Sequence, residues 1–206
     1  MSIPSGILIE KYGEKKVMIL AFMIAFSGAL LFAVFPQYIV AVLSLFFIGS
    51  GMAMLQVAIN PLLRVSGGEE NFAFNSVMAQ LFFGLASFLS PLVYSYLVLN
   101  IGTDDMGIFL SVISELVPED LPWISLYLIF ALVSIIMVIV ISISKFPEVL
   151  KNEDEKVGAL ETHLEMLKNK KVILFFLGIF AYVGAEQGVA NWISEFLSSY
   201  HGYDPQ

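Results

Sequence analysis

Five long stretches that are almost free of charge constrain this chain more than any other feature of its sequence. Each is long enough to cross the ~30 Å hydrocarbon core of a bilayer as a helix rising 1.5 Å per residue. Apolar residues make up 58% of the chain and charged residues only 14%, against about 25% charged residues in soluble domains. A single water-soluble core is therefore excluded. The stretches are residues 17–35, 38–63, 72–99, 121–144 and 172–200.

The sequence predicts an all-α membrane protein with five full transmembrane helices plus the end of a sixth. The sixth element is residues 1–9, which are apolar but too short to cross a membrane. A signal peptide would start with basic residues and finish at a small-residue cleavage site. Because neither is present, we expect the last turns of a helix whose beginning lies outside this sequence.

Lysine and arginine residues occupy alternate connections only, which predicts the orientation. The connections without any are 36–37, 100–122 and the tail from residue 201. We therefore expect residues 10–16, 64–71 and 145–171 on the cytoplasmic side of the cell membrane. They hold Lys11, Lys15, Lys16, Arg64, Lys145, Lys151, Lys156, Lys168, Lys170 and Lys171.

Two connections carry helical patterns of their own. In 100–122, apolar residues such as Ile108, Val112 and Leu116 recur at helical spacing among acidic residues, which predicts a short amphipathic helix on the outer surface. In 145–171, leucines at 160, 164 and 167 predict a helix across the cytoplasmic ends. That helix is a solvated linker between two halves, or alternatively a partner-binding segment.

Amide side chains occur inside two of the predicted spans. Gln56 and Asn60 lie four residues apart, about 40° around one helix, and Gln80 shares a stripe with Gly84 and Ser87 on the next span. Such residues either bond neighbouring helices together or face a polar cavity. Both interpretations stay open for these three amides.

A carboxyl group occurs near the middle of the last span. Glu186, Gln187 and Asn191 lie within about 140° of helix surface, and Trp192 adjoins them. A carboxylate at membrane depth costs at least about 2.5 kcal/mol, so we expect function to retain Glu186. The alternative is a permanent salt bridge between two halves.

Several classes of function find no support in the residues. The chain has no cysteine, and its two histidines fall on opposite sides of the predicted membrane, so no thiol chemistry or shared histidine metal site is expected. A net charge of −8 disfavours nucleic acid as a partner. No phosphate loop or nucleophile elbow is present. We expect neither an enzyme nor a cofactor.

One glycine-rich segment supplies a family resemblance. It starts at Gly6, continues through Glu10, Lys11, Gly13 and Lys15, ends at Lys16, and reads GILIEKYGEKK. It resembles the signature between the second and third helices of the major facilitator superfamily, with Glu10 in place of the usual aspartate. The resemblance implies a conformational role for this cytoplasmic motif.

Two further segments resemble the fucose permease group of sugar:cation symporters. Residues 49–80 look like its fourth and fifth helices, and residues 182–196 like its seventh. The resemblance implies a partial major facilitator fold from the end of helix two to helix seven. Residues 1–144 would form the N-terminal six-helix bundle without its first helix and most of its second, 145–171 the interdomain linker, and 172–206 the first helix of the C-terminal bundle.

That family implies alternating access, with a sugar or similar small polar solute bound between the two bundles. Its fourth and seventh helices face the central cavity, as Gln56 and Glu186 would here. The proton-coupled members carry a glutamate where this chain has Gln56, which leaves as coupling options sodium, a proton on Glu186, or an acid on the first helix. We expect the remaining helices of the parent transporter and the lipid bilayer as partners, and no transport by these residues alone. The alternatives are an exporter of drugs or other solutes, and a non-transporting membrane scaffold.

Overall fold

The computed structural model describes residues 2–103, 107–118, 120–146 and 168–203. The chain divides into two compact units, residues 1–156 and 157–206, which are described separately. Every regular element in the described residues is helical, and five helices are long and apolar enough to cross a membrane. The prediction of five spans is therefore confirmed.

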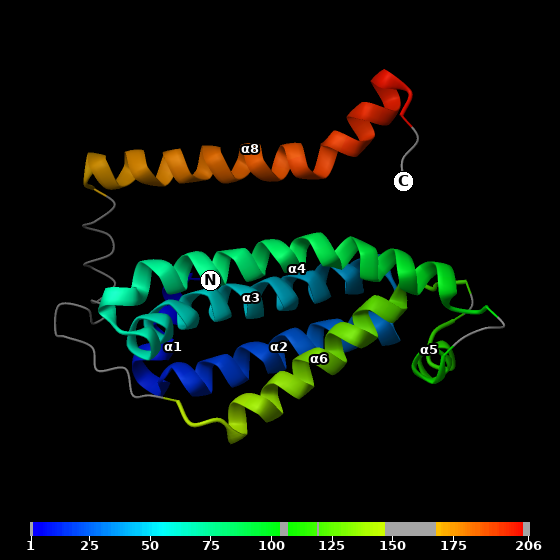
Figure 1. The fold of residues 1–206 in the computed structure, drawn as a ribbon, viewed down its shortest axis with the longest axis horizontal. Helices are drawn as coiled ribbons and strands as arrows, with labels where there is room; N and C mark the ends of the chain where they lie inside the picture. Colours follow the sequence, from blue (N-terminus) through cyan, green and yellow to red (C-terminus); the bar gives the residue numbers. More distant parts are fainter. Residues whose placement is uncertain (1, 104–106, 119, 147–167, 204–206) are drawn as a thin grey trace. The chain divides into compact units, whose positions relative to one another are not determined.

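Unit 1 is a bundle in which α2 lies between α3 and α6 (Figure 1). The short helices α1 and α5 lie at opposite ends of this bundle. The helices are α1 Ser2–Tyr12, α2 Glu14–Val34, α3 Tyr38–Gly67, α4 Phe72–Asn100, α5 Ile108–Ser114 and α6 Ile124–Ile143, with a 3-10 turn η1 at Glu69–Asn71.

Small residues bring α2 and α3 into close contact. Ser44, Gly51 and Ala58 recur every seven residues along α3 and are all buried. A Cβ atom on Gly51 would lie 2.6 Å from the carbonyl oxygen of Ala21 on α2. Likewise, a Cβ atom on Gly28 would lie 2.8 Å from the carbonyl oxygen of Ser44. Glycine is therefore required at both positions, because the two backbones leave no room for a side chain.

The connection predicted at residues 10–16 is far shorter than expected. Helix α1 continues through Glu10 and Lys11 to Tyr12, and α2 begins at Glu14. Only Gly13 separates them, with φ 82°, which glycine adopts without steric cost. The prediction of a loop was wrong because charged side chains outside the apolar layer are compatible with helical backbone. For the same reason α3 includes Arg64, and α8 includes Lys170 and Lys171.

Lys15 connects the start of α2 to the end of α6. Its Nζ donates to the carbonyl oxygens of Ser142 (2.9 Å) and Ser144 (2.8 Å), and lies 6.0 Å from the ring centroid of Phe146. The last carbonyls of a helix have no partner within the helix and carry a partial negative charge. Lys15 therefore caps α6.

The helix predicted within residues 100–122 is present as α5. One face packs on the bundle: Ile113 and Val117 are buried with Ile124, which begins α6. Ile108, Val112 and Leu116 are exposed on the other side. The buried stripe runs through Leu110, Ile113 and Val117, so the apolar residues from which the helix was predicted, Ile108, Val112 and Leu116, are not the ones that pack on the bundle. The linker helix predicted around residues 160–167 lies outside the described residues.

Unit 2 is described by one long helix, α8, Lys170–His201. Asn169 caps its start, where Oδ1 accepts a hydrogen bond from the backbone N–H of Lys171 (3.0 Å). Gly202 ends it in the left-handed conformation (φ 68°), and its N–H bonds to the carbonyl of Ser198, as glycine commonly does after a helix. Both ends of α8 are therefore capped by residues that flank the helix.

Candidate functional site

A cleft of about 450 Å³ lies between α3 and α4, which run side by side in unit 1 (Figure 1). Its volume falls in the range of roughly 300–1,000 Å³ that is typical of small-molecule pockets. Three of the predicted site residues, Gln56, Asn60 and Gln80, line it together. The other lining residues are Met52, Leu55, Ile59, Leu63, Ser76, Ala79 and Phe83.

Helix geometry and chain topology bring these side chains together. Gln56 and Asn60 lie four residues apart on α3, and Ser76 and Gln80 lie four apart on α4, so each pair shares one helix face. The short connection at residues 68–71 turns the chain back, so α4 is antiparallel to α3. Gln56 precedes the end of α3 at Gly67 by eleven positions, about 16 Å at 1.5 Å per residue. The polar part of the cleft therefore reaches toward the middle of the span.

The polar groups of the cleft are uncharged and available for hydrogen bonding. Within the part of the chain that the structure describes, the amides of Gln56, Asn60 and Gln80 make no hydrogen bond to another residue. The hydroxyl of Ser76 is buried and also has no partner there. Each amide offers donors and an acceptor, and the hydroxyl offers both. This arrangement suits a neutral solute with several hydroxyl groups.

Of the lining residues, sequence reasoning found the three amides and missed the others, among them Ser76 and Phe83. Both follow from helical spacing, because they lie four residues before and three residues after Gln80 on the same face of α4. The stripe that the sequence suggested instead, through Gly84 and Ser87, does not line the cleft. The hydroxyl of Ser87 donates to the carbonyl oxygen of Phe83 (3.0 Å), so its own helix already satisfies it.

The other residues predicted for substrate binding or coupling belong to α8. Glu186 lies at the middle of this helix, and the side chain of Asn191 donates to the backbone oxygen of Gln187 (2.8 Å). All four side chains, including Trp192, are exposed within unit 2. Their convergence with Gln56 and Asn60 on one cavity stays a prediction.

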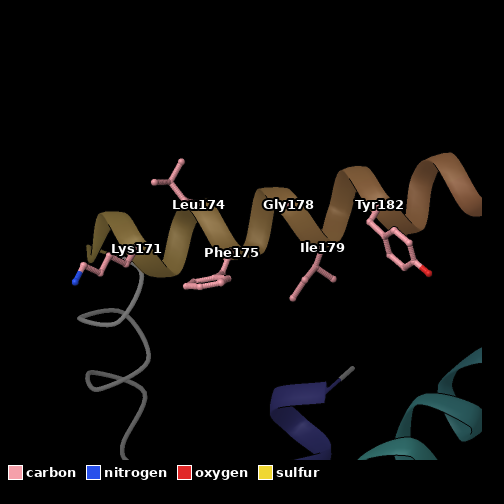
Figure 2. A pocket seen from close by; sticks show the side chains of 6 residues that line it. All are labelled: Lys171, Leu174, Phe175, Gly178, Ile179 and Tyr182. Atoms are coloured by element: carbon pink, nitrogen blue, oxygen red, sulfur yellow. The ribbon is translucent and has the colours of Figure 1, made fainter. Parts of the chain in front are cut away.

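A second depression, of about 470 Å³, runs along the first half of α8. Figure 2 shows Phe175, Ile179 and Tyr182 on one side of the helix and Leu174 pointing away. The remaining lining residues are Lys171 and Gly178. All of them come from one helix, and none is a predicted site residue, so this depression is an apolar helix face rather than a polar binding site.

The residues that the structure describes do not form a candidate metal site. No group of three or more histidine, aspartate or glutamate side chains lies close enough there to hold a metal ion. The polar and aromatic groups that line the cleft are three amides, one hydroxyl and one phenyl ring.

Comparison with known proteins identifies the fold to which this cleft belongs. The sequence matches the Major Facilitator Superfamily along residues 1–206. The chain belongs to the major facilitator superfamily. It is 30% identical to a glucose/galactose transporter of Brucella abortus biovar 1 (strain 9-941), over 96% of this chain and 46% of that protein. It is 25% identical to the L-fucose-proton symporter of Escherichia coli (strain K12), over 94% of this chain and 47% of that protein.

A solved structure supports the same assignment for this member of the superfamily. A crystal structure of a variant of FucP, the E. coli fucose:proton symporter, superimposes with a TM-score of 0.67 at 25% sequence identity. The match covers 95% of this chain and 50% of the FucP chain. The expected partial major facilitator fold and the membrane setting are thus confirmed, and the chain spans about half the length of the relatives it matches.

Proposed function

We propose that these residues belong to a secondary transporter that moves a hexose or a similar small polar solute across the cell membrane by alternating access. The observation that carries this proposal is the cleft between α3 and α4, where Gln56, Asn60 and Gln80 converge with no charged side chain among the lining residues. Amides hydrogen-bond sugar hydroxyls through both donors and acceptors. The relatives named for glucose, galactose and L-fucose support the same class of solute.

Transport of this kind requires two helical bundles that move against each other. The described residues supply one bundle and a single further helix, α8. We therefore propose that residues 1–206 act together with additional helices, here called the complete transporter, and do not transport alone. In this scheme residues 1–144 form the first bundle, 145–171 the cytoplasmic linker and 172–206 the start of the second bundle.

Coupling to an ion gradient is assigned to Glu186. The described residues that line the α3–α4 cleft include no titratable side chain, and Glu186 occupies the middle of an apolar 32-residue helix. A carboxylate at that depth is retained when it binds a proton or a cation. The relative named as a proton symporter supports H+ as the coupling ion, and Na+ is the alternative.

Uptake of radiolabelled hexoses by the complete transporter tests this function. We expect glucose, galactose or fucose to accumulate, and Gln56→Leu and Asn60→Leu to abolish accumulation because each removes the hydrogen-bonding groups of the cleft. Ser87→Ala serves as the control, since that hydroxyl is satisfied within α4. Wild-type accumulation by both leucine variants would show that the amides of the cleft do not bind the solute. Absence of any solute transport would indicate a scaffold, and dye export without hexose uptake would indicate an exporter. Each of these results contradicts the proposal.

A further inference from the structure

We infer that Phe83 is the aromatic surface on which the apolar face of the transported sugar stacks. This inference rests on the proposed function and adds a specificity-determining residue to it. Phe83 lies on α4 one turn beyond Gln80 and lines the same cleft as Gln56 and Asn60. Its side chain is 57% exposed within unit 1, so the ring is accessible from the cleft.

The composition of the cleft leads to this assignment. A pyranose presents hydroxyl groups around its edge and C–H groups on its face, so a site for it needs hydrogen-bonding groups beside an apolar plane. Gln56, Asn60 and Gln80 provide the hydrogen-bonding groups. Among the described residues that line the cleft, Phe83 alone provides an aromatic ring, and its electron-rich face attracts polarised C–H groups.

Stacking predicts which hexose the site favours. In galactose the axial hydroxyl at C4 leaves the C–H groups of C3, C4 and C5 together on one face. In glucose the C4 hydroxyl is equatorial, and the C–H groups of C3 and C4 lie on opposite faces. A stacking ring at Phe83 therefore favours galactose over glucose, whereas amide groups alone hydrogen-bond both sugars.

Phe82 offers a matched control on the same helix. It is also exposed (66%), and it lines an adjoining depression, which shares Ile59, Leu63 and Ala79 with the cleft but does not include Phe83 or the three amides. Phe82→Leu and Phe83→Leu therefore make the same chemical change at neighbouring positions, outside and inside the proposed site. Phe83→Trp keeps an aromatic face and tests whether the ring itself matters.

The experiment measures equilibrium binding and uptake of galactose and glucose by the complete transporter and its three variants. We expect Phe83→Leu to weaken galactose binding by about 3- to 10-fold and glucose binding by less, in line with the energy of aromatic stacking. Phe83→Trp and Phe82→Leu should stay within about twofold of the wild type. Expression and thermal stability are compared alongside, because a folding defect would weaken both sugars equally.

Two outcomes overturn this inference while leaving the proposed function intact. One is hexose binding by Phe83→Leu that equals the wild type, and the other is an equal loss for galactose and glucose in a stable variant. Absence of hexose binding by the wild-type transporter would overturn the proposed function and this inference together.

Discussion

Replacement of Gly51 by alanine tests the close approach of α2 and α3 most directly. The added Cβ would lie 2.6 Å from the carbonyl oxygen of Ala21 and 3.1 Å from the Cβ of Ala25. Carbon contacts are optimal at about 3.5–4.0 Å, so the two helices must separate by roughly 1 Å. The carbonyl oxygen belongs to the backbone of α2 and cannot rotate away as a side chain would. Overpacking of this kind costs about 1–3 kcal/mol.

Gly49→Ala provides the matched control on the same helix. A Cβ atom at Gly49 has no neighbouring atom within 4 Å. Alanine is favoured over glycine in a helix by about 0.5–1 kcal/mol, and both variants gain this term. We therefore expect Gly49→Ala to be as stable as the wild type or slightly more stable, and Gly51→Ala to be less stable than Gly49→Ala by about 1–3 kcal/mol.

The difference in stability between these variants is measured by thermal and denaturant unfolding of the complete transporter in detergent. Loss of the monodisperse gel-filtration peak serves as the readout. Gly28→Ala should behave as Gly51→Ala does, because its Cβ would meet the Ser44 carbonyl oxygen at 2.8 Å. Equal stability of Gly51→Ala and Gly49→Ala would show that the helices do not approach as closely as described, and the packing argument would fail.

Two further substitutions test charged residues. Lys15→Met removes both hydrogen bonds to the Ser142 and Ser144 carbonyls. We expect this change to lower the free energy of unfolding, measured by thermal unfolding, by about 1 kcal/mol, because solvent screening weakens these charge-assisted bonds. Lys16→Met is the control, and equal stability of the two variants would contradict the cap. Glu186→Gln should abolish gradient-driven accumulation while retaining sugar exchange. Glu195→Gln is the control and should retain both activities, since the Glu195 carboxylate accepts a hydrogen bond from Ser199 (2.9 Å) within α8. Wild-type accumulation in Glu186→Gln would remove this residue from coupling.

The membrane spans could be predicted well because a span is recognised from the total length of its apolar stretch rather than from any single residue. The predicted 38–63 and 72–99 correspond to α3, Tyr38–Gly67, and α4, Phe72–Asn100. The errors lie at the ends, as with the single-residue junction at Gly13. Backbone hydrogen bonding and capping decide where a helix ends, and hydropathy reports only where the apolar layer ends.

The candidate site was predictable only in part, for a different physical reason. Amides in an apolar span are conspicuous, so Gln56, Asn60 and Gln80 stood out. Ser76 and Phe83 did not, because serine and phenylalanine are ordinary residues of membrane helices. Their membership in the cleft depends on which face of α4 meets α3, and that rotation is set by packing along the whole helix.

The packing face and the site face of α3 depend on each other. Ala58 is completely buried, and it is two residues, about 200° of helix rotation, from both Gln56 and Asn60. Contact of Gly51 and Ala58 with α2 therefore fixes the rotation at which the two amides point away from α2 into the cleft. A larger side chain on the packing face would displace α3 and, with it, the amides. The small residues of α3 are thus a requirement of the site as well as of the bundle, even though none of them is among the residues that line the cleft.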